Sequence, residues 1–217
     1  MEEIKRFLME NTDEKNAKFA RGLINTKYKI CGTKMKKLVD FARILVKEGK
    51  KPQFIHITYH EEILILGFMI ALLKVDKKEK LKQLDKLLPF IDNWATCDSI
   101  IPRMTDLGSE KEYFISLLSR DEIYCQRAGI VWCKRFLLKE DVSGTISLLE
   151  RVRSDDYYVN MALAWTYQEA FIYDFDFMYN YIKQIGNSFI KRKTISKCCD
   201  SLRLSKGQKE KLKELRA

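Results

Sequence analysis

The sequence predicts an all-α protein, arranged as a superhelical solenoid of antiparallel helix pairs. Apolar residues recur with the 3.6-residue helical period along nearly the whole chain of 217 residues. The chain contains only 3 Pro and 9 Gly. That is too little turn chemistry for an all-β sandwich or barrel, which needs a turn every ~8–12 residues. Hydrophobic residues make up 46% of the chain, enough for a sizeable core.

Taken in order along the chain, the helical period predicts twelve helices. The second is expected to have Thr33 as its N-cap, followed by an apolar stripe that includes Leu38, Ala42 and Leu45. The third is apolar nearly all round, so it should be central in the fold. The predicted ranges are 13–25, 33–48, 60–73, 76–88, 92–107, 109–118, 121–138, 141–153, 156–172, 175–185, 188–200 and 205–216.

The spacing of these helices indicates repeats. Helices of ~10–17 residues joined by short loops form antiparallel hairpins, and a spacing of ~35–40 residues per pair is typical of HEAT-like repeats, the ARM-type class of solenoid. A compact helical bundle is the alternative. Residues 54–59 alternate like a strand but have no partner strand, so we expect a helix or an extended loop there. No linker interrupts the chain, and we expect a single domain over residues 1–217.

The positive charge is concentrated in two blocks. The net charge is +10, but residues 27–51 carry nine basic and two acidic side chains, and residues 188–217 carry ten basic and three acidic ones. Each block therefore has a net charge of +7, on a body that is close to neutral. Two such blocks can form one surface for a polyanion, of which nucleic acid is the commonest. The alternative is that they are solvated, lysine-rich helix faces.

Metal, membrane and secretion signals are lacking in the sequence. The six cysteines contain no Cys-x-x-Cys pair, and His56 and His60 are four residues apart without a third ligand, so we expect no metal and no cofactor. No stretch approaches 18 uncharged apolar residues, and the N-terminus does not resemble a secretory signal. We therefore expect a soluble, cytoplasmic protein with no membrane partner, and a monomer.

Two aromatic segments are candidates for chemistry. Trp94 and Asp98 are four residues apart, so they share one helix face, where a ring and a carboxylate suit a cationic ligand. Tyr158, Ala162 and Trp165 share a face of a later helix. In both cases the alternative is ordinary core packing, with Asp98 as a cap or an ion-pair partner.

One cation lies within an apolar helix. Arg127 stands in the segment Ile-Tyr-Cys-Gln-Arg-Ala-Gly-Ile-Val and needs an anionic partner, either a neighbouring carboxylate or a phosphate. Trp132, on the same predicted helix, is expected to be a packing residue.

The order of these segments resembles a known family. Trp-x-x-x-Asp (94–98), the downstream Arg127 and Tyr-Tyr-Val-x-Met-Ala-x-Ala-Trp (157–165) are similar to the DNA alkylation repair family, the AlkD-like glycosylases built of HEAT-like repeats. The tail Ser196–Ser205 is similar to the ending of small family members. Two positions depart from the family pattern: Lys34 and Met35 stand near a usual Pro, and Asn160 stands where a basic residue is frequent.

The resemblance implies a DNA glycosylase that grips duplex DNA and removes N3- or N7-alkylated purines. By position, Asp98 would be the catalytic carboxylate, Trp94 and Trp165 the aromatic walls beside the damaged nucleotide, and Arg127 a phosphate contact. Tyr158 and the basic residues of the two blocks are the further candidates for DNA contacts. They are Lys34, Lys36, Lys191, Arg192, Lys193 and Arg203.

The residue types suit this chemistry without a metal or a cofactor. An N3- or N7-alkylated purine already carries a positive charge and leaves readily, so the growing oxocarbenium character of the deoxyribose is what must be stabilised. A carboxylate can do this, and indole rings favour the same cation. The other functions that the sequence allows are a non-catalytic HEAT-like module that binds nucleic acid and a helical scaffold that binds proteins.

Overall fold

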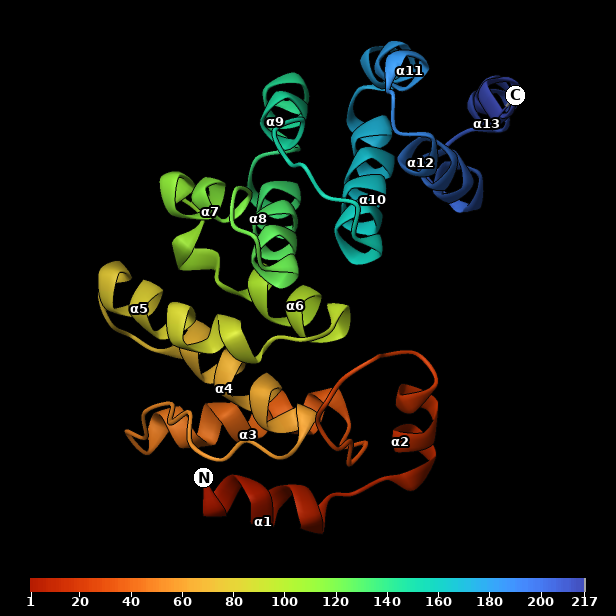
Figure 1. The fold of residues 1–217 in the computed structure, drawn as a ribbon. Helices are drawn as coiled ribbons and strands as arrows, with labels where there is room; N and C mark the ends of the chain where they lie inside the picture. Colours follow the sequence, from red (N-terminus) through yellow and green to blue (C-terminus); the bar gives the residue numbers. More distant parts are fainter. Residues whose placement is uncertain (217) are drawn as a thin grey trace. The chain divides into compact units, whose positions relative to one another are not determined.

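The computed structural model describes residues 1–216, and it is all-α (Figure 1). Over this range the backbone forms thirteen α-helices and four short 3-10 turns, and no β-strand. The residues pack into two compact units, the first from Met1 to Ser109 and the second from Glu110 onward. Each unit is described separately below.

Unit 1 is built around a central buried helix. It contains α1 (Glu2–Glu10), α2 (Glu14–Arg21), α3 (Met35–Lys47), α4 (His60–Leu72), α5 (Lys77–Leu87) and α6 (Trp94–Ile100). Every residue of α4 from His60 to Ile70 is buried, and α1, α3, α5 and α6 pack against it. The prediction that this uniformly apolar helix is central is therefore confirmed.

Helix α6 lies very close to α4. A Cβ atom added to Gly67 of α4 would lie only 2.3 Å from Cδ1 of Ile100, at the end of α6. Only glycine permits that approach, since any side chain at this position would overlap the isoleucine. Gly67 thus permits the close packing of α6 against α4.

Unit 2 is organised around the longest helix in the described chain. It contains α7 (Lys111–Leu117), α8 (Ile123–Phe136), α9 (Val142–Leu149), α10 (Tyr157–Tyr173), α11 (Phe175–Gln184), α12 (Ser188–Asp200) and α13 (Lys206–Lys213). Helices α8, α11 and α12 all pack against α10 (Figure 1). Trp132 of α8 is fully buried and stacks on Phe114 with ring centroids 4.8 Å apart, which confirms its packing role.

Three predictions about helix boundaries are wrong. No helix is predicted over residues 2–10, where α1 forms and buries Ile4 and Leu8. The N-cap of α3 is Lys34 rather than Thr33, whose hydroxyl instead donates to the backbone carbonyl of Asn11. The helix predicted over 92–107 ends at Ile100, because Pro102 lies within a 3-10 turn, Ile101–Arg103, and a second such turn follows at Thr105–Leu107.

The segment that alternates like a strand is an extended loop, one of the two forms predicted for it. It ends at Tyr59, which makes an isolated parallel bridge with Lys29.

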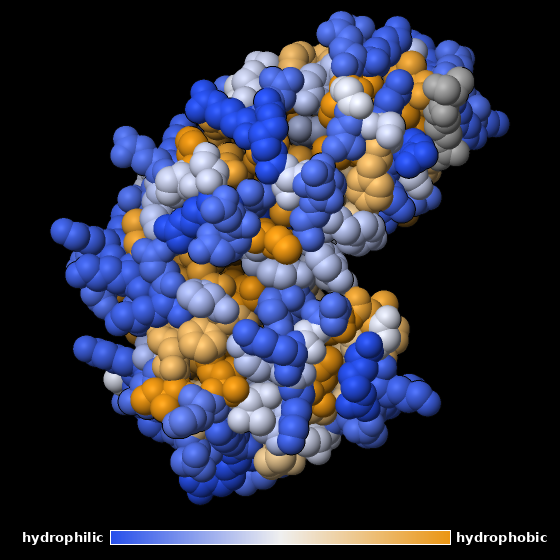
Figure 2. Space-filling view, viewed as in Figure 1, coloured by the Kyte–Doolittle hydropathy of each residue, from blue (hydrophilic) through white to orange (hydrophobic). Residues whose placement is uncertain are grey.

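The visible surface is largely hydrophilic, with scattered apolar groups (Figure 2). No helix within residues 1–216 has the length and the apolar character to cross a bilayer. The HEAT-like solenoid and the single-domain organisation stay predictions.

Candidate active site

Helix α6 presents the first pair of predicted site residues. Trp94 is its first residue, and Asp98 follows one turn later on the same face; both side chains are half-buried. The helix is only seven residues long, and it begins after Asn93, whose side-chain oxygen accepts the backbone N–H of Thr96 as an N-cap. A helix this short is not stable by itself, so its position depends on contacts with the rest of unit 1.

One of these contacts comes from a buried histidine at the start of α4. Nδ1 of His60 lies 3.1 Å from Oγ1 of Thr96 and 3.3 Å from Nδ2 of Asn93. The Asn93 amide nitrogen can only donate, so Nδ1 accepts and the ring is neutral with its proton on Nε2. Burial lowers the pKa of His60, while the nearby carboxylates of Glu61 and Asp92 oppose that shift.

A second contact ties the start of α6 to a distant loop. The carboxylate of Asp92 accepts hydrogen bonds from the hydroxyl of Thr26, at 2.8 and 2.9 Å, and from the backbone N–H of Lys27, at 2.8 Å. It also accepts from the Asn93 amide at 2.9 Å. The N-terminus of α6 is therefore held both by α4 and by the loop around residue 26.

In unit 2, Trp165 of α10 is the predicted site residue with the most distinctive surroundings. Two ammonium groups lie over its ring, Nζ of Lys134 from α8 and Nζ of Lys197 from α12, each 5.5 Å from the ring centroid. The indole Nε1 is covered from solvent and has no hydrogen-bond acceptor among the described residues. Ala162, one turn earlier on the same face, is buried.

Arg127 and Tyr158 meet in the same unit. The Arg127 side chain on α8 is buried, and its Nη1 donates to the backbone carbonyl of Tyr158 at 2.5 Å. The Tyr158 ring lies 6.0 Å from that of Tyr124 and 5.4 Å from that of Tyr157. The arginine therefore connects α8 to the first turn of α10.

The remaining predicted basic residues lie on two helices and in the two segments next to them. In unit 1, Lys34 precedes α3 and Lys36 lies on it, with the Lys36 side chain 92% exposed. In unit 2, Lys191, Arg192 and Lys193 lie on α12. Arg203 follows that helix and pairs with Glu169 of α10 at 2.7 Å.

A comparison of the sequence with protein families shows which family the chain matches. The family described as DNA alkylation repair enzyme matches residues 4–201, which span most of both units. The chain belongs to this family. It is therefore an enzyme of DNA repair, and DNA is its substrate. A comparison with individually curated proteins finds no significant match.

Within this DNA alkylation repair enzyme, the sequence reading missed the residues that support the site. His60 and Asn93 are 33 positions apart, and no local pattern pairs them. The sequence could have indicated Lys134 as a site residue, because it follows Arg127 by seven residues and so lies on the same face of the helix. Lys197 was counted in the basic block, but its position over Trp165 arises from the packing of α12 on α10.

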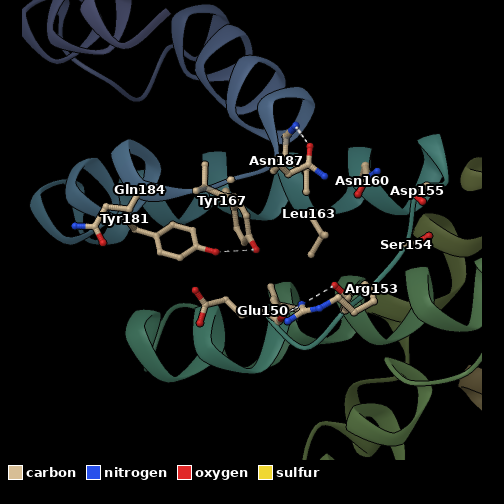
Figure 3. Close-up of a pocket in the computed structure, with 15 residues that line it drawn as sticks. Glu150, Arg153, Ser154, Asp155, Asn160, Leu163, Tyr167, Tyr181, Gln184 and Asn187 are labelled. Atoms are coloured by element: carbon tan, nitrogen blue, oxygen red, sulfur yellow. Dashed lines mark hydrogen bonds between the residues drawn. The ribbon is translucent and has the colours of Figure 1, made fainter.

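A cleft of about 930 Å³ also opens in unit 2 of the repair enzyme (Figure 3). Asn160, Leu163 and Tyr167 of α10 line it, on the side of that helix that faces away from Trp165. The Tyr167 and Tyr181 hydroxyls lie 3.3 Å apart inside the cleft, and burial raises the pKa of both tyrosines. None of the described residues that line the cleft belongs to the predicted site.

Proposed function

We propose that this repair enzyme is a DNA glycosylase that excises N3- or N7-alkylated, positively charged purines from duplex DNA. The observation that carries the proposal is the pair on α6: Trp94 and Asp98 lie one turn apart on one face of a helix that is anchored at its start by Asn93, His60 and Asp92. The family match, which covers both units, supports DNA as the substrate.

The proposed reaction breaks the bond between C1′ of the deoxyribose and the purine nitrogen. The bonding electron pair moves to the purine and neutralises its positive charge, so the base leaves without a proton donor. Positive charge then develops on the sugar, and the Asp98 carboxylate stabilises it electrostatically. Water adds to C1′ and releases its proton, which the same carboxylate can accept. This scheme uses neither a metal nor a cofactor.

The other predicted residues have supporting roles in this proposal. The indole rings of Trp94, on α6 in unit 1, and Trp165, on α10 in unit 2, each favour the cationic form of the damaged nucleotide. Arg127 of α8 and Tyr158 of α10, which are joined by a hydrogen bond, contact the DNA backbone near the lesion. Phosphates further along the duplex are neutralised by the basic residues Lys34, Lys36, Lys191, Arg192, Lys193 and Arg203.

One experiment tests this function. The purified protein is incubated with a duplex that contains a single N7-methylguanine, and the released base is measured by chromatography. We expect release that is catalytic and unaffected by a metal chelator. A matched duplex with uracil at the same position should release no base, because uracil lacks the built-in leaving-group charge. Tight binding of both duplexes without any release would instead support a non-catalytic nucleic-acid-binding module.

A further inference from the structure

Two ammonium groups lie over the ring of Trp165, and no carboxylate among the described residues forms an ion pair with either of them. Lys134 and Lys197 reach the indole from α8 and α12, the helices that pack on α10. Within the described part of the chain, neither ammonium group makes an ion pair. The carboxylate one turn along α10, that of Glu169, is already paired with Arg203. Two like charges therefore share one aromatic ring.

This arrangement has two physical consequences. The uncompensated positive charge over Trp165 attracts an anion, and a DNA phosphate binds an ammonium more strongly than an aromatic ring does. At the same time, two ammonium groups at 5.5 Å from the centroid repel any further cation that approaches this ring. A cationic purine can thus use the Trp165 ring only after the lysines have moved away.

We infer that Lys134 and Lys197 are phosphate-binding residues that occupy the Trp165 ring in the free protein and leave it when duplex DNA binds. Backbone phosphates draw the two ammonium groups off the indole, and the uncovered ring then accepts a positively charged nucleobase. The buried Nε1 of Trp165 supports the exchange, since this donor is covered and unpaired in the free state and can meet an acceptor oxygen once the lysine stems move. The nucleobase part of this inference rests on the proposed glycosylase function.

The phosphate part is tested with undamaged duplex DNA. Lys134→Met and Lys197→Met keep an unbranched apolar stem and remove the charge. The slope of log K against log salt should become shallower by about 0.9 for each variant and by about 1.8 for the double variant. Lys183→Met is the matched control, because that lysine also lies over a ring, that of Tyr179 on α11 at 4.6 Å. Its slope should equal the wild-type slope, and an unchanged slope in the double variant would overturn the phosphate assignment.

The exchange itself is tested with N7-methylguanosine, a small cationic nucleoside without a phosphate. Calorimetry should show that the double variant binds this probe several-fold more tightly than wild type, although it binds duplex DNA more weakly. Equal or weaker binding of the probe by the double variant would overturn the idea that the lysines block the ring. Circular dichroism and urea unfolding verify that each variant is folded. Because both readouts measure binding, they remain decisive even if the wild-type protein releases no base, a result that would refute the glycosylase function alone.

Discussion

The buried guanidinium of Arg127 donates a hydrogen bond to the backbone carbonyl of Tyr158, and so links α8 to the first turn of α10. An arginine in an apolar helix suggested an anionic partner, and the structure shows that a main-chain carbonyl is one of its acceptors. The same helix, α10, carries Trp165 two turns later. The position of the Trp165 face therefore depends on a contact made by a residue 38 positions earlier in the sequence.

Replacing Arg127 should lower the free energy of unfolding, because its first role is structural. Arg127→Met removes a charged hydrogen bond, which typically contributes about 1.5–3 kcal/mol to the free energy of unfolding. Urea denaturation should show a loss of this order, and Arg127→Lys should recover part of it. If Arg127 also contacts a phosphate, Arg127→Lys will retain more DNA affinity than Arg127→Met. Wild-type stability in Arg127→Met would contradict the structural role.

The charge of Asp98 is the centre of the proposed mechanism. Asp98→Asn keeps the shape of the side chain and removes the negative charge, so release of N7-methylguanine should fall by about 10²-fold or more, equivalent to about 2.7 kcal/mol of transition-state stabilisation. Binding to undamaged DNA should stay the same or tighten slightly, because a repulsion with phosphate is lost. The measurement is a single-turnover rate of base release.

Asp85→Asn is the matched control for that prediction. This carboxylate lies on α5, outside the predicted site, and its replacement should leave the rate of base release unchanged. A wild-type rate in Asp98→Asn would remove the carboxylate from the mechanism. Equal losses in both variants would indicate a general effect of net charge instead.

Binding to duplex DNA should depend steeply on salt. If several phosphates are neutralised by the two basic blocks, the slope of log K against log salt should be roughly −4 or steeper. Reversal of Lys191, Arg192 and Lys193 to Glu on α12 should weaken binding to every sequence alike. Reversal of Lys78 and Lys82 on α5, which lie outside both blocks, should have a smaller effect. Affinity that is nearly independent of salt would refute the nucleic-acid surface.

Two variants of Trp132 distinguish a packing role of this residue from a catalytic one. Its side chain is fully buried between Phe114 and Phe136, so Trp132→Ala should destabilise the protein by about 3–5 kcal/mol. Trp132→Phe retains an aromatic ring and should keep the rate of base release in the folded protein. Thermal unfolding and a release assay check the two variants. Activity lost in a stable Trp132→Phe protein would show that the catalytic role of a tryptophan has been assigned to the wrong residue.

The buried His60 predicts how stability changes with pH. Its folded pKa is lowered, so below about pH 6.5 the unfolded chain binds a proton that the folded protein does not. The free energy of unfolding should therefore fall as the pH drops below this value, with a slope of at most ~1.4 kcal/mol per pH unit. His60→Gln should reduce that slope. Parallel pH profiles for wild type and His60→Gln would contradict this explanation.

Most of the helices could be predicted because their burial is periodic. Helix α4 is the clearest case, since its continuous apolar sequence indicated a central position. Helix α1 was missed because only Ile4 and Leu8 are buried among charged neighbours, which leaves a narrow stripe. The helix predicted over 92–107 was too long, although Pro102 was a visible signal for its end.

The candidate site was less predictable than the fold. Trp94 and Asp98 are close in sequence, so the helical period alone placed them on one face. Their support from His60 and Asp92, and the lysines over Trp165, join residues between 31 and 66 positions apart. Such pairs arise from tertiary packing, which a local pattern does not contain.

The shortness of α6 gives the pair on it a particular vulnerability. Seven residues cannot hold a helix alone, so the face that bears Trp94 and Asp98 exists only while the hydrogen bonds of Asp92 and Asn93 persist. A local opening that frees the loop at Thr26 and Lys27 would undo this face while the apolar interior around α4 stays closed. If the proposed base excision depends on this face, a small fluctuation at the edge of unit 1 should abolish it long before the protein unfolds.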